Sequence, residues 1–337
     1  FLIFLTINSI LSLAYNLLFH IKLWYNVPNS MQSKEITMKI KKILTSMTQA
    51  ILLSIGLLIS LGAGLGIGYV GGLVKDQPVL TQKEMKEQIN NISKNSEVYF
   101  GSGEKLGTIN SELIRKTVTY ENIGDNVKNA IIASEDSNFY SNSGIDIRAV
   151  LRATHSEATG ARTTGGSTIT QQLVKNQLLD NSRSYERKAK EILLALRVDS
   201  HFSKNEILEN YLNVAPFGKN SLGQNISGIE TAAQGVFGVH SKDLNIAQAA
   251  YLVGFVQSPY TYTPFDSAGN IRPDEELQAG FERQQYVLER MLSNDFITKE
   301  QFEEAKKFDI KGAYTKQKYS EYTDYPYIRD EVTSSVA

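Results

Sequence analysis

Two long apolar stretches without charged residues dominate the N-terminal part of the chain. Residues 1–19 form the first, and the second covers residues 43–74, between a group of lysines and Lys75. About 20 apolar residues in a helix are enough to cross a bilayer, so we predict a transmembrane helix over residues 50–74. The lysines within residues 31–49 place that side in the cytoplasm, because basic residues are enriched in cytoplasmic flanks.

This helix is predicted to be an uncleaved signal-anchor, because no convincing small-residue cleavage site follows it. The rest of the chain would then lie on the extracytoplasmic face of the cell membrane, behind a single span with a cytoplasmic N-terminus. Residues 1–30 are interpreted as an additional span or as an upstream mis-start, and the mis-start is favoured.

Polar residues take over after the apolar helix. Residues 75–96 are rich in lysine, glutamate and glutamine, and we predict that they form a stalk. Residues 97–109 combine two short apolar runs with a glycine-containing turn, a pattern that predicts a hairpin. This hairpin would open the next domain.

From Gly124 onward, apolar residues recur at helical spacing. The first helix would be capped by Asp125 or Asn126 and end near Glu135, and a small, polar, mobile loop is expected over residues 155–166. Further helices are predicted to begin at Gly165 and to cover residues 182–198, 204–212, 229–237, 245–257 and 275–293. The expected fold class is mainly α, with one domain over residues 97–310 and a tyrosine-rich polar segment over 311–337.

Composition excludes several classes of protein. The 337 residues carry 35 Lys and Arg against 36 Asp and Glu, and this balance argues against a nucleic-acid partner. The chain has no cysteine, which excludes thiolate metal sites, catalytic cysteines and disulfides. Its four histidines lack the spacing of metal ligands. No P-loop or dinucleotide fingerprint is present, so we expect no organic cofactor.

The segment 165–176 combines a glycine pair with polar side chains at regular intervals. Ser167 is placed to cap a helix, and Ser167, Gln171 and Lys175 follow one another every four residues, so they would share a helical face. Hydroxyl, amide and ammonium groups on one face suit a polar, anionic ligand. A solvated amphipathic helix is the alternative, and the segment alone leaves both open.

Glu135 is the first candidate for a general base. It is predicted at the C-terminal end of a helix, where the macrodipole disfavours an anion, and the apolar Phe139 follows closely. Both features favour a carboxylate that accepts a proton. An exposed acid beside Asp136 is the alternative.

A second cluster is basic. Arg183, Arg187 and Glu191 are four residues apart and would share one face of a helix. The cluster is interpreted either as an ordinary surface ladder of charges or, with Lys175, as a cationic cradle for phosphate.

Taken together, these stretches resemble the peptidoglycan glycosyltransferase family, the transglycosylase module of class A penicillin-binding proteins. The resemblance covers roughly residues 97–295 and includes five motifs in order. They are Glu135-Asp136-x-x-Phe139 with Gly144-Ile-Asp146, Gly165-Gly-Ser-Thr-Ile-Thr-Gln-Gln-Leu-Val-Lys175-Asn176, Arg187-Lys188-x-Lys190-Glu191, Lys204-Asn-Glu-Ile-Leu-Glu209-Asn-Tyr211-Leu-Asn213 and Gly228-Ile-Glu-Thr-Ala-Ala-Gln-Gly-Val-Phe-Gly238.

The resemblance implies a lysozyme-like helical head beside a smaller mobile jaw at the membrane surface. It implies polymerisation of lipid II into β-1,4-linked glycan, with inversion at the anomeric carbon and loss of undecaprenyl pyrophosphate. Implied partners are lipid II, the nascent glycan strand, the cell membrane, cell-division or elongation proteins and the inhibitor moenomycin.

The resemblance also implies roles for individual residues. Glu135 would be the base, and Glu191 would assist at the pyrophosphate, with a divalent cation such as Mg or Mn as an option there. The substrate-binding set comprises Asp136, Arg152, Ser167, Gln171, Gln172, Lys175, Asn176, Arg183, Arg187 and Lys188. Among these, Lys175, Arg183 and Arg187 would bind the pyrophosphate.

Two departures from the family pattern stand out. Asn142 occupies the position where the first motif usually carries His, and an amide can donate a hydrogen bond but cannot carry a proton. The sequence motifs of a transpeptidase domain are absent, so residues 311–337 are interpreted as the start of a linker to a domain that is missing.

Two other functions remain open. The first is a lysozyme-like glycan-cleaving enzyme, either a lytic transglycosylase or a muramidase, which would also use a glutamate at a helix end. It would have no need of Lys175, Arg183 and Arg187 together. The second is a membrane-tethered scaffold without catalytic activity, and only Asn142 favours it.

Overall fold

The structure is a computed structural model that describes residues 31–75, 80–91, 97–99, 101–103, 105–108, 113–149, 152, 166–180, 182, 184–315 and 331. It divides into two compact units, residues 1–73 and 74–337. The predicted mobile loop falls almost entirely outside the described residues, as does the predicted additional span over residues 1–30.

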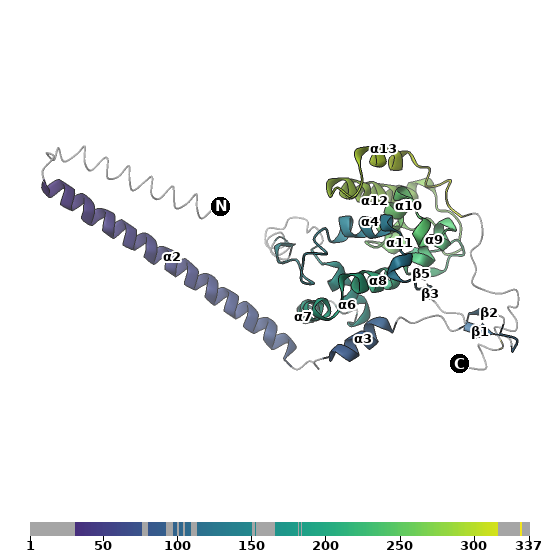
Figure 1. Ribbon diagram of the computed structural model, residues 1–337, viewed down its shortest axis with the longest axis horizontal. Coiled ribbons are helices and arrows are strands. Elements are labelled where there is room, and N and C mark those ends of the chain that lie inside the picture. Colours follow the sequence, from purple (N-terminus) through teal and green to yellow (C-terminus); the bar gives the residue numbers. More distant parts are fainter. Residues whose placement is uncertain are drawn as a thin grey trace. The chain divides into compact units, whose positions relative to one another are not determined.

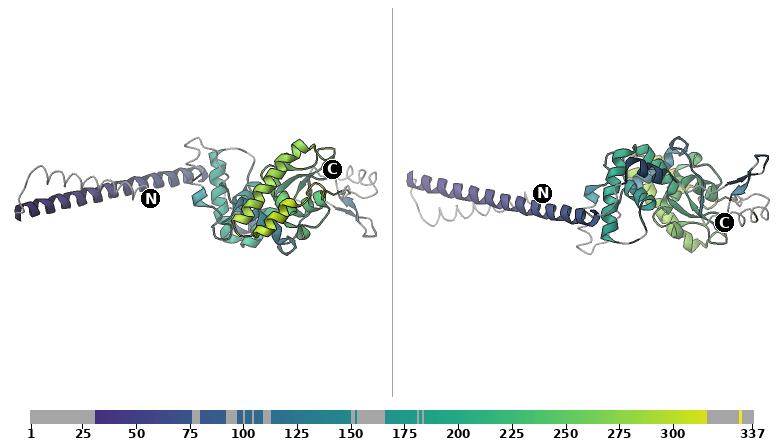
Figure 2. Two further views of the ribbon diagram at one scale, coloured as in Figure 1. Left: turned by 90° about the horizontal axis from the view of Figure 1, so that it is seen from above. Right: turned by 90° about the horizontal axis from the view of Figure 1, so that it is seen from below.

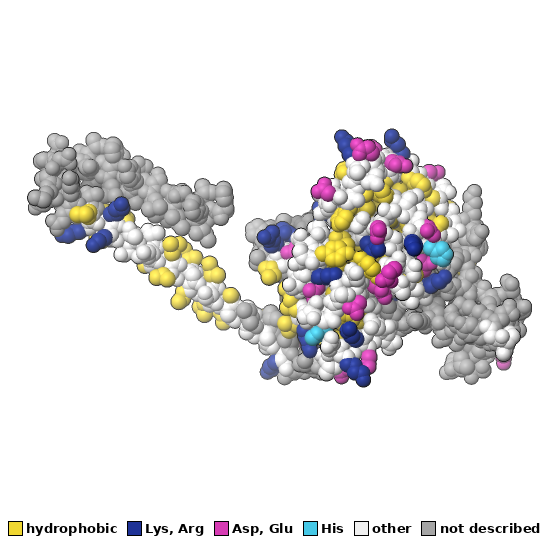
Figure 3. Space-filling view, viewed as in Figure 1, with side chains coloured by type: hydrophobic (Ala, Val, Ile, Leu, Met, Phe, Trp, Pro, Cys, Tyr) yellow, Lys and Arg dark blue, Asp and Glu magenta, His cyan; other side chains and the backbone are white. Residues whose placement is uncertain are grey.

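The described part of the first unit is one long helix, α2 (Met31–Val74). Its stretch Met38–Gly66 is long and apolar enough to cross a membrane, with a mean hydropathy of 1.8, and its apolar side chains are exposed. Figure 3 shows them along the helix, with lysines gathered towards its N-terminal end. The predicted apolar helix is therefore confirmed, although the stretch begins and ends earlier than the predicted 50–74.

The second unit is mostly helical, as predicted (Figure 1). Its α-helices are α3 (Gln82–Asn90), α4 (Asp125–Glu135), α6 (Ile169–Gln177), α7 (Tyr185–His201), α8 (Lys204–Val214), α9 (Ile229–Phe237), α10 (Ile246–Phe255), α11 (Pro259–Tyr262), α12 (Asp274–Ser293) and α13 (Lys299–Lys307). Short 3-10 helices occur at Tyr120–Asn122 and Ser241–Asp243.

Five short strands accompany the helices within the residues that the structure describes. β1 (Glu97–Tyr99) and β2 (Lys105–Thr108) pair antiparallel, which confirms the predicted hairpin. β3 (Leu113–Arg115), β4 (Pro216–Lys219) and β5 (Asn225–Ser227) form a second sheet, in which β5 is parallel to β3 and antiparallel to β4. This second sheet was not predicted, because strands of three or four residues are too short to show an alternation of apolar and polar residues.

Local sequence signals set several helix starts. Thr81, Thr168, Ser203, Asn245 and Thr298 each accept a hydrogen bond from the backbone three residues on, and the Glu or Gln there bonds back. Such capping boxes satisfy two backbone donors that the helix itself leaves free.

The helices form two packed groups, and the helices of the first group lie above those of the second in Figure 1. The first group comprises α4, α10, α12 and α13, and the second comprises α3, α6, α7 and α8. α12 and α13 run side by side (Figure 2). Both groups contribute to one apolar core, whose largest fully buried side chains include Phe139, Tyr211 and Tyr251. The site described below lies where α4 of the first group meets α6 of the second.

The apolar core extends beyond both predicted domain boundaries. Residues 75–96 are not only a stalk, because α3 lies within them and buries Met85 and Ile89 completely in the core. At the other end, Tyr314 is buried beyond the predicted limit of 310, and its hydroxyl lies 2.6 Å from that of Tyr251. The α-helix α13 was also missed, since six of its nine residues are charged.

Two predicted caps need correction. Thr168, not Ser167, caps α6, because its hydroxyl accepts from Gln171 N. Gly124 precedes α4 without a side-chain cap, and Asp125 is its first helical residue. The predicted helix 182–198 begins at Tyr185 instead, since Ser184 provides the cap.

Candidate active site

Glu135 is the last residue of α4 and lies between two helices from distant parts of the chain. Its Oε1 is 2.8 Å from Nη2 of Arg283 on α12, and its Oε2 accepts a 3.2 Å hydrogen bond from Nε2 of Gln172 on α6. Gln172 in turn accepts a 2.9 Å bond from the hydroxyl of Tyr211 on α8. The carboxylate side chain is only 16% exposed, so these donors fix it in a largely dry setting.

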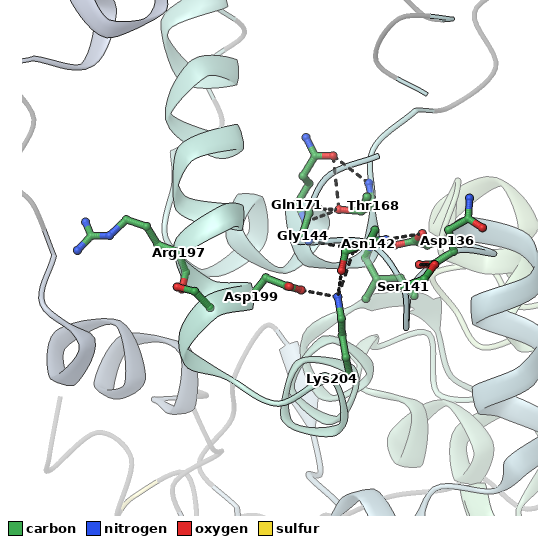
Figure 4. Close-up of polar contacts among 12 residues, drawn as sticks. Asp136, Ser141, Asn142, Gly144, Thr168, Gln171, Arg197, Asp199 and Lys204 are labelled. Carbon is green, nitrogen blue, oxygen red and sulfur yellow. Dashed lines mark hydrogen bonds and ion pairs between the residues drawn. The ribbon is translucent and has the colours of Figure 1, made fainter. Parts of the chain in front are cut away.

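The next residue, Asp136, ties the turn after α4 to the start of α6 (Figure 4). Its carboxylate accepts from the backbone N of Ile169 and from the Asn142 amide. The oxygen of that amide accepts from the Gly144 backbone and from Lys204 on α8, which also pairs with Asp199. Asn142 thus buttresses the turn by hydrogen bonds alone.

Gly144 lets this turn approach α7 closely. Its φ is +84°, a conformation that favours glycine, and a Cβ there would lie 2.5 Å from the carbonyl oxygen of Ala195. The Gly144 carbonyl accepts a 2.6 Å bond from the hydroxyl of Thr168. These contacts therefore fix the turn after Glu135 relative to the cap of α6 and the middle of α7.

A cluster of charges surrounds Glu191 on α7. Its Oε1 accepts from Lys188 Nζ and, at 3.1 Å, from Gln171 Nε2, while its Oε2 lies 3.5 Å from Nη1 of Arg187. Lys188 also donates to the Ser167 hydroxyl at 2.9 Å. Because Glu191 is 3% exposed, this is no ordinary surface ladder: a buried carboxylate holds two cations in place.

A cavity of about 260 Å³ opens beside Glu135. Its walls come from the end of α4, the turn after it, the segment before α6, and α12. Among the predicted residues it is lined by Glu135, Asp136, Arg152 and Ser167, and among those not predicted by Asp146, Tyr286 and Arg290.

The structure separates the predicted substrate-binding residues into three sets. Glu135, Asp136, Arg152, Ser167 and Gln172 lie at the cavity or bond to Glu135, and Arg187, Lys188 and Glu191 form the adjoining charge cluster. Lys175 and Asn176 are exposed near the end of α6 and do not line the cavity. Arg183 lies outside the described residues.

Gln171 does not line this cavity. Its side chain is completely buried, its oxygen closes the capping box with the Thr168 backbone, and its nitrogen bonds Glu191. Because Ser167 lies before the helix and Gln171 points inward, Ser167, Gln171 and Lys175 do not form the predicted polar face.

Glu191 does not fit the predicted role at a divalent cation. Both of its oxygens are already directed at cationic side chains, which would repel a metal ion. No group of three or more His, Asp or Glu side chains suited to a metal occurs within the part of the chain that the structure describes.

Three side chains of α12 at the site were not predicted from the sequence. Arg283, Tyr286 and Arg290 are spaced by three and four residues, so they share one face of the helix. Arg283 reaches Glu135, while Tyr286 and Arg290 line the cavity. Their spacing was the only signal in the sequence, and it is also typical of a solvated helix face.

Burial and charge affect the acids of the site differently. Burial raises the pKa of Asp136, and the bonds from Asn142 and Ile169 and the charge of Lys204 offset this only in part. Burial also raises the pKa of Asp146, but hydrogen bonds from Ala149 N and Asn138 outweigh it, so its pKa is lowered overall. Burial and, next, the negative charge of Glu135 raise the pKa of Tyr211, which keeps its hydroxyl as a donor to Gln172.

Comparison with known proteins places this site in a sequence context. A family model described as Transglycosylase matches residues 102–292, a range that includes Glu135, Glu191 and Arg283. Penicillin-binding protein 1A of Aquifex aeolicus is 40% identical over 242 residues, which are 72% of this chain and 31% of the relative. Penicillin-binding protein 1A/1B of Bacillus subtilis is 35% identical over 273 residues, covering 77% of this chain and 28% of the relative.

The chain thus spans about a third of the length of the curated relatives it matches. A crystal structure of penicillin-binding protein 1A from Haemophilus influenzae is 20% identical, with a TM-score of 0.39, over 72% of this chain and 25% of that one.

Proposed function

The chain belongs to the transglycosylase family, and on that premise we propose that it is a peptidoglycan glycosyltransferase that polymerises lipid II into β-1,4-linked glycan strands. One observation carries this proposal: a glutamate at the end of α4 opens onto a cavity, and a cluster of cations adjoins the same cavity. A base beside cations suits a reaction in which a hydroxyl displaces a pyrophosphate.

In the proposed reaction, the 4-hydroxyl of the acceptor's GlcNAc attacks the anomeric carbon of the donor's MurNAc. A new C–O bond forms as the bond from that carbon to undecaprenyl pyrophosphate breaks, and the configuration inverts. Glu135 takes the proton of the hydroxyl and later releases it to water. General bases of this kind contribute about 10²–10⁴-fold to the rate.

The leaving group needs charge neutralisation more than a proton. Lys188 and Arg187, aligned by Glu191, provide two positive charges that we assign to the pyrophosphate, together with Lys175 and Arg183. Fixed charges that meet developing negative charge lower the barrier without reorganising during the reaction. Ser167, Gln172, Asp136 and Arg152 would line the sugar-binding groove.

The apolar helix supports a membrane-anchored enzyme. We propose that α2 spans the membrane with its lysine-rich end in the cytoplasm, so that the second unit acts on the extracytoplasmic face. A tether in the bilayer that holds lipid II raises the effective concentration of enzyme at its substrate. Cell-division or elongation proteins are the partners expected there.

A polymerisation assay tests the proposal. Purified full-length chain in detergent should convert lipid II into glycan that lysozyme degrades, and moenomycin should block the reaction. Shortening of pre-made glycan without polymer formation would instead identify a glycan-cleaving enzyme. Binding of lipid II with neither reaction would identify a scaffold.

A further inference from the structure

Arg283 is the charged side chain of α12 that reaches the candidate base. Its Nη2 lies 2.8 Å from Oε1 of Glu135, and the two side chains are only 12% and 16% exposed. Water therefore screens this ion pair much less than it screens a pair on the surface. The sequence resemblance assigned no role to Arg283.

The surroundings of Arg283 hold its guanidinium in place. The group lies over the ring of Tyr286, 4.5 Å from the ring centroid, where a cation is attracted to the aromatic face. On the other helix, α10, Gly254 leaves room for the arginine stem, since a Cβ there would lie 3.0 Å from Arg283 Cγ. The arginine is thus guided towards Glu135 by its own helix and by α10.

Glu135 is held on both of its oxygens from opposite sides of the site. Arg283 of α12 approaches Oε1, and Gln172 of α6 donates to Oε2. Since a carboxylate oxygen accepts more than one hydrogen bond, a lone pair remains on each oxygen for a substrate hydroxyl.

The other charged and titratable groups around Glu135 do not reproduce this contact. Tyr211 of α8 acts through Gln172, and Asp136 is directed at Asn142 and Ile169. Asp146, Arg152, Tyr286 and Arg290 line the cavity, and Arg290 donates to the carbonyl of Ala133. In the described part of the site, Arg283 is the cation in direct contact with the Glu135 carboxylate.

We propose that Arg283 is the positioning residue of the base: it orients the Glu135 carboxylate towards the acceptor hydroxyl. This inference rests on the proposed function, in which Glu135 takes that proton. Arg283 then acts through Glu135 and need not touch the substrate.

The test compares Arg283→Gln with Arg283→Lys and with a matched control, using the full chain. Arg272→Gln is the control, because Arg272 is also partly buried, lies 3.6 Å from the carboxylate of Glu276 and does not line the cavity. The readouts are kcat and KM for lipid II, together with the ¹³C NMR chemical shift of the Glu135 carboxyl at one fixed pH in protein with labelled glutamate, assigned with Glu135→Gln.

We expect Arg283→Gln to lower kcat about tenfold, because the carboxylate loses its fixed orientation, while KM stays within twofold. The ¹³C signal of the Glu135 carboxyl should also move, because its contact with the guanidinium is lost. Arg283→Lys should regain only part of kcat, because it lacks the planar fork. Arg272→Gln should keep the wild-type kcat and the wild-type Glu135 signal.

The inference is overturned if Arg283→Gln keeps the wild-type kcat, or if it is faster than the wild type because the arginine blocks the base. The NMR signal keeps the inference separate from the proposed function. If the wild type fails to polymerise lipid II, the proposed function fails, whereas a changed Glu135 carboxyl signal in Arg283→Gln still supports the contact. An unchanged signal refutes it.

Discussion

The amide nitrogen of Asn142 lies 3.0 Å from each carboxylate oxygen of Asp136. The family's first motif usually carries His at this position, and the structure gives the amide a defined role. It bridges the carboxylate on one side and Lys204 and the Gly144 backbone on the other. Because the side-chain amide of Asn142 does not ionise, its charge stays the same across the physiological pH range.

Replacing Asn142 with Ala should therefore weaken the fold. The buried carboxylate of Asp136 would lose its side-chain donor, and removing a hydrogen bond to a buried charged group costs about 2 kcal/mol. The free energy of unfolding of detergent-solubilised protein, from urea titration, measures the effect. The exposed Asn138→Ala is the control and should change stability by less than about 0.5 kcal/mol. Equal stability of both variants would rule out the buttress.

Glu135→Gln should abolish polymerisation while the protein stays folded. The amide has the same shape but cannot take up the hydroxyl proton, so kcat should fall by about 10²–10⁴-fold. Rates of lipid II polymerisation measure this, and lipid II binding by the variant is the control for an intact site. A turnover rate equal to that of the wild type would show that Glu135 is not the general base.

Lys175→Ala should raise KM for lipid II and leave stability unchanged. Lys175 is exposed at the end of α6, so its ammonium is available to a donor pyrophosphate. Loss of one charge-assisted contact is worth about 1.4 kcal/mol or more, hence about tenfold in KM. Lys299→Ala, at the exposed start of α13, should behave like the wild type. An unchanged rate at low lipid II concentration would show that Lys175 is an ordinary solvated lysine that does not bind the donor.

Glu230 should make stability depend on pH. Burial raises its pKa, but hydrogen bonds from Ser241 N–H, the Ser241 hydroxyl and His240 outweigh this, so the pKa lies below the ordinary value of 4.5. A depressed folded-state pKa gives stability that is present above the unfolded value and lost as pH falls through the folded one.

Glu230→Gln should accordingly be less stable than the wild type by about 2 kcal/mol at pH 7, and the difference should shrink as the pH falls below 4.5 and the wild-type carboxylate becomes protonated. Unfolding free energies between pH 3 and 7 measure this. The exposed Glu275→Gln should follow the wild type throughout, and a gap that persists at low pH would contradict the assignment.

Local signals in the sequence predicted much of the helical fold. The bounds of α9 were predicted as observed, because glycines flank a largely apolar segment, and Glu135 does end its helix. α3 and α13 were not recognised, since both are polar helices that bury only two side chains each, such as Met85 and Ile89 of α3. The spacing of apolar residues and the amino-acid composition therefore give little indication that such helices are present.

Contacts at the site depended on long-range packing that no local pattern encodes. Arg283 and Glu135 are 148 positions apart, and nothing near either residue indicates its partner. Gln171 shows the reverse: it lies in a recognisable motif, yet the cap at Thr168 turns its side chain inward to Glu191. A motif thus indicated some of the residues that gather at the site, but not which way each one points.

The burial of Tyr314 determines where this protein can be shortened. Its ring packs near Phe237, Tyr251 and Phe265, and the next residue, Thr315, donates from its backbone to Val236. A recombinant fragment that stops at residue 310 would lack Tyr314 and Thr315, and its aromatic core would be exposed to water. One that extends through residue 315, and begins before α3, keeps the core closed at both ends.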